Sequence, residues 1–209
     1  MGNIKIIVLI SGRGSNLKAI AEECKKKRTP AEIIAIISNN EFASGLKING
    51  KFKKIVIKGK KKTFEKELQT NLIKLKPDLI CLAGFMKILS PFIIKKWKNK
   101  IINVHPSLLP SFKGLDTHKR ALETGVKISG CTIHFVNESL DEGPIIAQGA
   151  ITIKKNMSSV DLQKEILKLE HIIYPKVIHL FSKKKILVKQ NKVFINDKNK
   201  EINKFIKNV

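Results

Sequence analysis

The chain has 209 residues and 43% of them are hydrophobic, so it can bury a substantial core and does not have the composition of a disordered chain. Its formal net charge is +24, but arginine is rare, the lysines are scattered and aromatic residues make up only 6%. This composition favours a solvated lysine-rich surface over a specific nucleic-acid site. The three cysteines lie far apart and predict neither a disulfide framework nor a zinc site, and no apolar run can span a membrane, so we expect a cytoplasmic protein without a metal.

The first half of the chain alternates strand and helix patterns. Five apolar runs predict strands that are buried on both faces of a parallel sheet. These runs cover residues 4–10, 31–38, 53–58, 78–85 and 100–105. Apolar residues at helical spacing predict helices at 15–27 and 63–75, with a weaker helix between the second and third strands. Strands separated by helices imply right-handed crossovers, and therefore an α/β fold with a doubly wound, mostly parallel, Rossmann-like sheet.

The second half of the chain has a different pattern. Two apolar segments at 130–136 and 143–153 follow one another closely, which predicts an antiparallel extension of the sheet. A long helix is predicted at 158–182, and a short hairpin at 185–195 with a frayed tail after it. Because no linker and no repeat interrupts the pattern, we expect one domain over residues 1–209.

The segment SGRGSN follows the first predicted strand, and ligands of doubly wound sheets bind at the carboxyl ends of the strands. Gly12 and Gly14 allow a tight turn there, and Ser15 or Asn16 can cap the next helix, whose free N–H groups attract an anion such as a phosphate. The dinucleotide motif is incomplete, because Leu17 stands where its third glycine belongs. A glycine turn without a ligand explains this segment equally well.

The segment AGFMKILSP follows the fourth predicted strand. Its apolar residues Met86, Ile88 and Leu89 lie on a predicted loop, where core residues are not expected, so they can form the wall of a pocket for a flat apolar ring. Ordinary packing beneath the next helix is the alternative, and the segment alone favours it.

The fifth predicted strand ends on an amide and an imidazole. Asn103 and His105 are separated by one residue, so an extended chain points both side chains to the same side, where both can donate hydrogen bonds to one oxygen. Asp141, in the turn-rich segment NESLDEGP, is the best candidate to orient the imidazole, although a plain turn aspartate is the alternative. With no activated nucleophile in the sequence, two donors and a carboxylate suit the stabilisation of a tetrahedral oxyanion while an external nucleophile attacks a carbonyl.

These residues carry a resemblance to a known family. HPSLLPSFKG followed by LDEGP resembles the folate-dependent formyltransferases. Together with ISGRGSNL and LAGFMKILSP, the four motifs are similar, in order over roughly residues 4–181, to the glycinamide ribonucleotide formyltransferases of purine synthesis. The resemblance implies that a formyl group moves from the co-substrate 10-formyltetrahydrofolate to the amine of N1-(5-phosphoribosyl)glycinamide, without a metal.

The resemblance also implies roles for individual residues. Asn103, His105 and Asp141 match the catalytic residues, with His105 as the proton-donating acid and Asp141 favouring its protonated form. Glu170 matches an acid near the glycinamide. The residues that match the site of the substrate phosphate are Gly14, Ser15 and Asn16.

The residues that match folate-binding positions are Lys61, Met86, Lys87, Ile88, Leu89, Asn103, Asn137, Glu138, Ser139, Leu140 and Asp141. Lys87 stands where relatives often carry arginine; it keeps the charge but cannot form a two-pronged hydrogen bond to a carboxylate. On this reading, residues 1–100 bind phosphate, residues 101–182 carry catalysis and folate binding, and residues 183–209 form a hairpin and tail.

Three other functions remain as alternatives. A formyltetrahydrofolate deformylase shares the His–Asp core, but the pattern starts at residue 4 and leaves no room before it for a regulatory domain. A methionyl-tRNA formyltransferase needs a tRNA-binding domain, for which residues after 182 are too few. A basic nucleic-acid-binding protein would make the Asn, His and Asp incidental. We therefore expect an enzyme for small molecules, monomeric or homodimeric, with neither a specific nucleic-acid partner nor a membrane partner.

Overall fold

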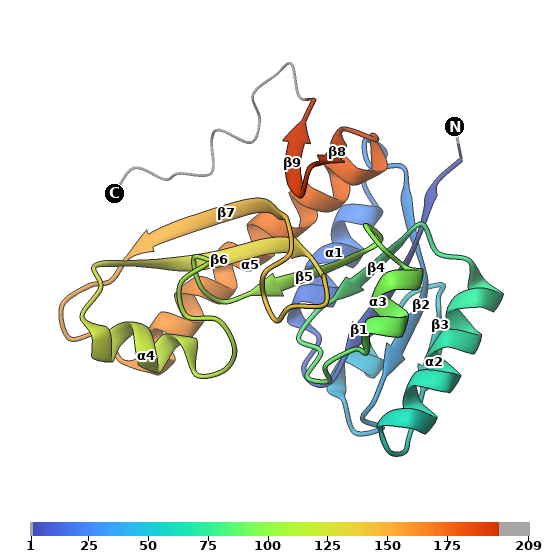
Figure 1. The fold of residues 1–209 in the computed structure, drawn as a ribbon, viewed down its shortest axis with the longest axis horizontal. Helices are drawn as coiled ribbons and strands as arrows, with labels where there is room; N and C mark the ends of the chain where they lie inside the picture. Colours follow the sequence, from blue (N-terminus) through green and yellow to red (C-terminus); the bar gives the residue numbers. More distant parts are fainter. Residues whose placement is uncertain (1, 197–209) are drawn as a thin grey trace.

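The computed structural model describes residues 2–196, and a seven-stranded sheet runs through their centre (Figure 1). Its strand order is β3-β2-β1-β4-β5-β6-β7, in which the first five strands pair in parallel and the last two pair antiparallel. The parallel strands are β1 (Ile4–Ile10), β2 (Ala31–Ser38), β3 (Lys53–Val56), β4 (Leu79–Leu82) and β5 (Ile101–His105). With β6 (Ile128–Phe135) and β7 (Ile145–Thr152) as the antiparallel extension, the predicted fold class is confirmed.

Within residues 2–196, six helical segments accompany the sheet: α1 (Ser15–Cys24), η1 (Ser44–Lys47), α2 (Lys61–Leu75), α3 (Pro91–Lys96), α4 (Thr117–Thr124) and α5 (Ser159–Ser182). Helix α1 ends at Cys24 rather than at residue 27, because residues 25–27 are all lysines and provide no apolar side chain that could anchor another turn in the core. The weaker helix between the second and third strands is the single 3-10 turn η1. No bounds were predicted for the helix after the fourth strand, which is α3, and α4 was not predicted.

Each face of the sheet buries its own hydrophobic cluster. Ile6, Val8 and Ile10 of β1 pack into the cluster that includes α1 and α5, while Ile7 and Leu9 pack into the cluster that includes α2 and α3. This alternation follows from the two-residue period of a strand, and it explains why the strand reads as a continuous apolar run. The helices on the two faces hold β1 and β4 at the centre of the sheet.

The strand order reverses between β1 and β4, so the carboxyl ends of these strands form the switch point where doubly wound folds bind ligands. Helix α5 crosses behind this region, and the buried Tyr174 hydroxyl donates a hydrogen bond to the Leu82 carbonyl at 3.1 Å. Beyond α5, β8 (Ile186–Lys189) and β9 (Lys192–Ile195) form the predicted hairpin, with Gln190 and Asn191 at its turn. The predicted frayed tail lies outside the described residues.

Candidate active site

Asn103 and His105 lie on the same side of β5, as the sequence predicts. The alternate residues Ile102 and Val104 belong to the hydrophobic cluster that packs on α5. His105 is the last residue of the strand, and its side chain is buried. Asn103 is partly buried. Both side chains therefore face away from α5, at the border between the parallel and antiparallel parts of the sheet.

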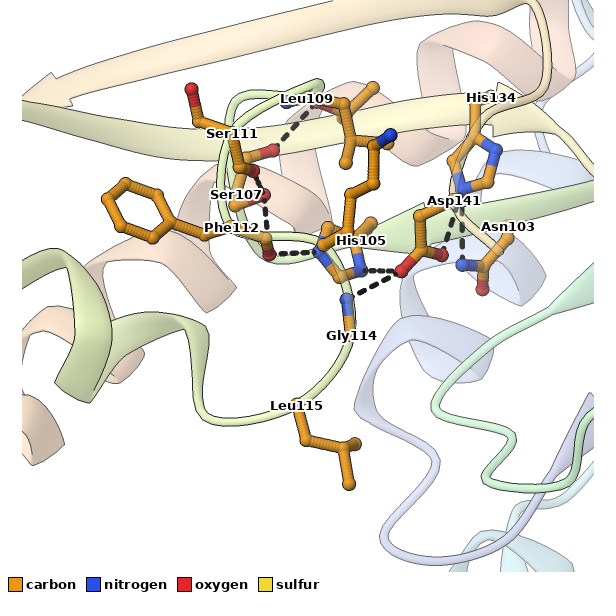
Figure 2. Close-up of polar contacts among 12 residues, drawn as sticks. Asn103, His105, Ser107, Leu109, Ser111, Phe112, Gly114, Leu115, His134 and Asp141 are labelled. Carbon is orange, nitrogen blue, oxygen red and sulfur yellow. Dashed lines mark hydrogen bonds and ion pairs between the residues drawn. The ribbon is translucent and has the colours of Figure 1, made fainter. Parts of the chain in front are cut away.

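Asp141 lies beside His105, because the loop between β6 and β7 folds back over the end of β5 (Figure 2). One Asp141 carboxylate oxygen, Oδ2, is 3.4 Å from His105 Nδ1 and accepts a hydrogen bond from the Gly114 N–H at 2.9 Å. Only 6% of the His105 side chain and 8% of the Asp141 side chain are exposed. The structure therefore brings together the imidazole and the carboxylate that the sequence could only suggest as partners.

The other ring nitrogen of His105 also faces an acceptor. Nε2 lies 3.0 Å from the Phe112 carbonyl oxygen, which has no hydrogen to donate. Both ring nitrogens of His105 therefore face oxygen acceptors, the Asp141 carboxylate on one side and the Phe112 carbonyl on the other.

The loop after β5 holds the Phe112 carbonyl in place. The Ser107 hydroxyl donates to the Ser111 carbonyl at 2.6 Å, and the Leu109 N–H donates to Thr132 Oγ1 at 3.0 Å. The Thr132 hydroxyl in turn donates to the Ser107 carbonyl at 2.7 Å. These bonds join the loop to β6, so the position of the acceptor for His105 is fixed by the neighbouring strand.

His134, which was not among the predicted site residues, lies next to Asn103. The two residues are direct cross-strand neighbours on β5 and β6, and Asn103 Nδ2 lies 3.3 Å from His134 Nε2. Burial lowers the pKa of His134, although Asp141 Oδ1 lies 3.8 Å from the same nitrogen and acts in the opposite direction. A histidine between apolar residues near the end of a buried strand is the signal that could have marked this residue.

The glycine turn after β1 has the predicted shape. Gly14 has a φ of 73°, and a Cβ added to it would lie 2.6 Å from the Gly45 Cα, so both its backbone conformation and its surroundings require glycine. Gly14 is the N-cap of α1 and no side chain caps this helix, so the prediction that Ser15 or Asn16 caps it was wrong. The reason is that the Asn16 side chain bonds elsewhere, to Glu170 on α5.

Asn16 and Glu170 form a buried pair across α1 and α5. Asn16 Nδ2 donates to Glu170 Oε2 at 2.6 Å, and each residue is only 6% exposed. Burial raises the pKa of Glu170 from its ordinary value of 4.5 to about 7, although the hydrogen bond from Asn16 acts in the opposite direction. Asn16 Oδ1 is buried and has no hydrogen-bond partner. The pair thus offers a substrate two groups: a carboxyl group that titrates near neutral pH and an acceptor oxygen without a partner.

The segment after β4 divides into exposed and buried residues. Met86 is 73% exposed and Ile88 is 68% exposed, whereas Leu89 is buried in the cluster under α2 and α3. The Met86 N–H donates to Ser11 Oγ at 2.9 Å, which joins this segment to the glycine turn. Only Met86 and Ile88 thus offer apolar side chains to a ligand, while Leu89 can contribute its backbone.

Lys87 points towards the start of α2. Its Nζ donates to the Gly59 carbonyl at 3.3 Å and lies 4.9 Å from the centre of the Phe64 ring. The exposed Lys61 begins α2 just after this glycine. The structure therefore places the two lysines predicted to meet folate near the same turn.

The residues between β6 and β7 form the other wall of the site. Glu138 pairs with Lys95 at 3.6 Å, Leu140 is 55% exposed, and the buried Asn137 Oδ1 has no hydrogen-bond partner. Ser139 is also exposed. Asp141 follows with a φ of 54°, a left-handed conformation that aspartate tolerates better than most residues.

The comparisons with known proteins agree with this geometry. A family model described as formyl transferase matches residues 4–178. The chain belongs to the formyl transferase family. An Escherichia coli protein named phosphoribosylglycinamide formyltransferase is 36% identical over 92% of this chain and 94% of its own length. The crystal structure of a protein with the same name from Anaplasma phagocytophilum has a TM-score of 0.88 at 41% identity, covering 94% of this chain and 96% of that one.

Other relatives of this formyl transferase are much longer. A Gallus gallus protein named trifunctional purine biosynthetic protein adenosine-3 is 41% identical over 85% of this chain, but the match covers only 18% of that protein. The chain therefore spans less than a fifth of the length of the trifunctional relatives that it matches.

Within residues 2–196, no group of histidine, cysteine and acidic side chains is arranged to hold a metal ion. None of the helices in the same residues is long and apolar enough to cross a membrane.

Proposed function

We propose that this enzyme transfers the formyl group of 10-formyltetrahydrofolate to the amine of N1-(5-phosphoribosyl)glycinamide, in purine biosynthesis. The names of the single-function relatives, which the chain covers almost completely, support this acceptor. The observation that carries the proposal is the cluster in which Asp141 lies 3.4 Å from His105, with Asn103 two residues before His105 on the same strand. Such a cluster suits attack of an amine on a formyl carbon.

In the proposed reaction the substrate amine forms a bond to the formyl carbon, and the carbonyl oxygen becomes an oxyanion. Asn103 and His105 donate hydrogen bonds to this oxygen. In the structure His105 Nε2 lies 3.0 Å from the Phe112 carbonyl, which is a neutral acceptor. A charged oxyanion is a stronger acceptor, so it can take over that hydrogen bond. The tetrahedral intermediate then collapses, and the bond between the formyl carbon and the folate nitrogen breaks.

Two protons must move to complete the transfer. The leaving folate nitrogen gains one, which we assign to the imidazolium of His105, and the attacking amine loses one, which a water beside Asp141 can accept. Asp141 stabilises the imidazolium through Oδ2, and the Gly114 N–H holds the same oxygen in place. No covalent enzyme intermediate and no metal enters this scheme.

The substrate phosphate is proposed to bind at the glycine turn. No side chain caps α1, so the N–H groups of its first turn can bind an anion, and Gly14 lets Ser15 and Asn16 approach it closely. Glu170 is proposed to contact the glycinamide part, because its carboxyl group bonds the Asn16 side chain between α1 and α5, where Asn16 Oδ1 has no partner.

Folate is proposed to lie between the two loops that flank the switch point. Met86 and Ile88 on one side and Leu140 on the other expose apolar side chains, which suits a flat pterin ring. The backbone of Leu89 and the residues Asn137, Glu138 and Ser139 complete this wall. Lys61 and Lys87 carry the charge that would meet the glutamate tail.

Growth complementation tests this proposal. The gene is expressed in a bacterial strain that lacks its own glycinamide ribonucleotide formyltransferases and needs added purine. We expect growth without purine for the wild-type protein and no growth for the His105→Ala variant at equal expression. Failure of the soluble wild-type protein to restore growth would contradict the proposed acceptor.

A further inference from the structure

His134 has a fixed tautomer in this structure. Its Nδ1 lies 2.9 Å from the carbonyl oxygen of Phe135, which can only accept a hydrogen bond. Nδ1 therefore carries the hydrogen, and in the neutral ring Nε2 is left with a lone pair. The ring is 1% exposed, so water does not compete for either nitrogen.

The tautomer of His134 determines how the Asn103 amide is turned. The lone pair on His134 Nε2 can only accept, and the amide end that faces it at 3.3 Å must be the NH₂ group. The amide oxygen of Asn103 then points away and makes no hydrogen bond within residues 2–196. One hydrogen of Asn103 Nδ2 is used by His134, and the second is left for a ligand.

We propose that His134 is a positioning residue of the transfer reaction, because its neutral imidazole turns the Asn103 amide so that an N–H, and not the carbonyl oxygen, meets the developing oxyanion. The inference rests on the proposed function. It concerns a residue that would act on the substrate only through Asn103, whose amide faces the His134 ring (Figure 2).

Protonation of His134 would undo this arrangement. An imidazolium would present an N–H at Nε2, which repels the Asn103 NH₂ group and attracts Asp141 Oδ1, at 3.8 Å. The charged or titratable groups that face the ring are Asp141, which favours the protonated form, and His105, which disfavours it. Burial also disfavours the charged ring, so the neutral state is the resting state near pH 7.

A double-mutant cycle with Asn103 tests the proposal. Complete loss of one oxyanion donor lowers kcat about 10²–10³-fold, so His134→Leu, which leaves the amide free to turn, is expected to lower kcat by roughly tenfold with little change in KM. In the Asn103→Ala background the same substitution should change kcat by less than about twofold, because the residue it acts through is gone. His134→Gln, which again offers an acceptor, should recover most of kcat.

A matched control is His179→Leu, because His179 is a histidine on α5 that bonds Thr29 and lies outside the proposed site. It should not produce the kcat loss. Equal losses from His134→Leu in both backgrounds, or none in either, would overturn the inference. An inactive wild-type protein would instead overturn the proposed function.

Nitrogen NMR of the wild-type imidazoles gives a readout that does not depend on activity or on variants that fold. We expect His134 to show the neutral Nδ1–H tautomer at pH 7 to 8. An Nε2–H tautomer, or an imidazolium at pH 7, would overturn the inference even if the protein is an active formyl transferase.

Discussion

The buried carboxyl group of Glu170 should make this protein lose stability as the pH rises from about 4.5 through 7. Its pKa is about 7 in the folded protein, whereas a glutamate in the unfolded chain titrates near its ordinary value of 4.5. Between these pH values the folded state binds more protons than the unfolded state, so the free energy of unfolding falls as the pH rises. Each unit of pKa is worth about 1.4 kcal/mol, which gives a loss of about 3 kcal/mol by pH 8.

Glu170→Gln isolates this contribution. Glutamine keeps an oxygen that accepts the bond from Asn16 Nδ2, and its NH₂ group can reach the unpartnered Asn16 Oδ1. The variant should be more stable than the wild-type protein at pH 8, by about 3 kcal/mol or roughly 6–12 °C in Tm, and only slightly different at pH 4.5.

Urea unfolding of both proteins at pH 4.5, 6 and 8 measures the effect. Glu67→Gln serves as the control, because Glu67 is exposed on α2 and should change the stability by less than about 0.5 kcal/mol at any pH. The reasoning is refuted if Glu170→Gln brings no gain at pH 8, or the same gain at all three pH values. The gain should come with weaker binding of the glycinamide substrate, which would explain why an acid occupies this buried position.

Three further predictions concern individual side chains. Asp141→Asn keeps the size of the side chain but removes the charge beside His105 Nδ1, so steady-state kcat should fall about 10²-fold or more at unchanged Tm; a kcat within threefold of wild type would contradict the role of the pair. Lys87→Ala should raise KM for the folate several-fold at nearly constant kcat, and an unchanged KM would remove Lys87 from the folate site. Burial raises the pKa of Cys24 to about 12 and those of Cys81 and Cys131 still further, so iodoacetamide at pH 8 should modify these thiols in urea but not in the native protein, as mass spectrometry can show; rapid native labelling would disprove their burial.

The architecture could be predicted from the sequence because its signals are local. Each parallel strand is a continuous apolar run, since it is buried on both faces, and the alternation of strands with helices implies the doubly wound order. Helices α3 and α4 escaped this reasoning. Helix α3 has only six residues, too few to show a helical period, and α4 buries only Thr117 and Ala121.

The candidate site depends on contacts that no local pattern contains. The sequence marks Asn103 and His105 as one group, because two residues of one strand share a face. It predicts an antiparallel extension of the sheet, but not that β6 pairs with β5 in the register that brings His134 to Asn103, nor that the loop before β7 brings Asp141 to His105. The Asn16–Glu170 bond is likewise set by the packing of α1 against α5, and this is why the predicted side-chain cap of α1 failed.

The most direct test of the central claim is to follow release of folate from a 10-formyl folate analogue by absorbance, with and without glycinamide ribonucleotide, using purified folded protein. We predict folate release only when the ribonucleotide is present, together with one formylated ribonucleotide per folate released. Folate release at the same rate without the ribonucleotide would contradict the account, because water and not the amine would then be the acceptor.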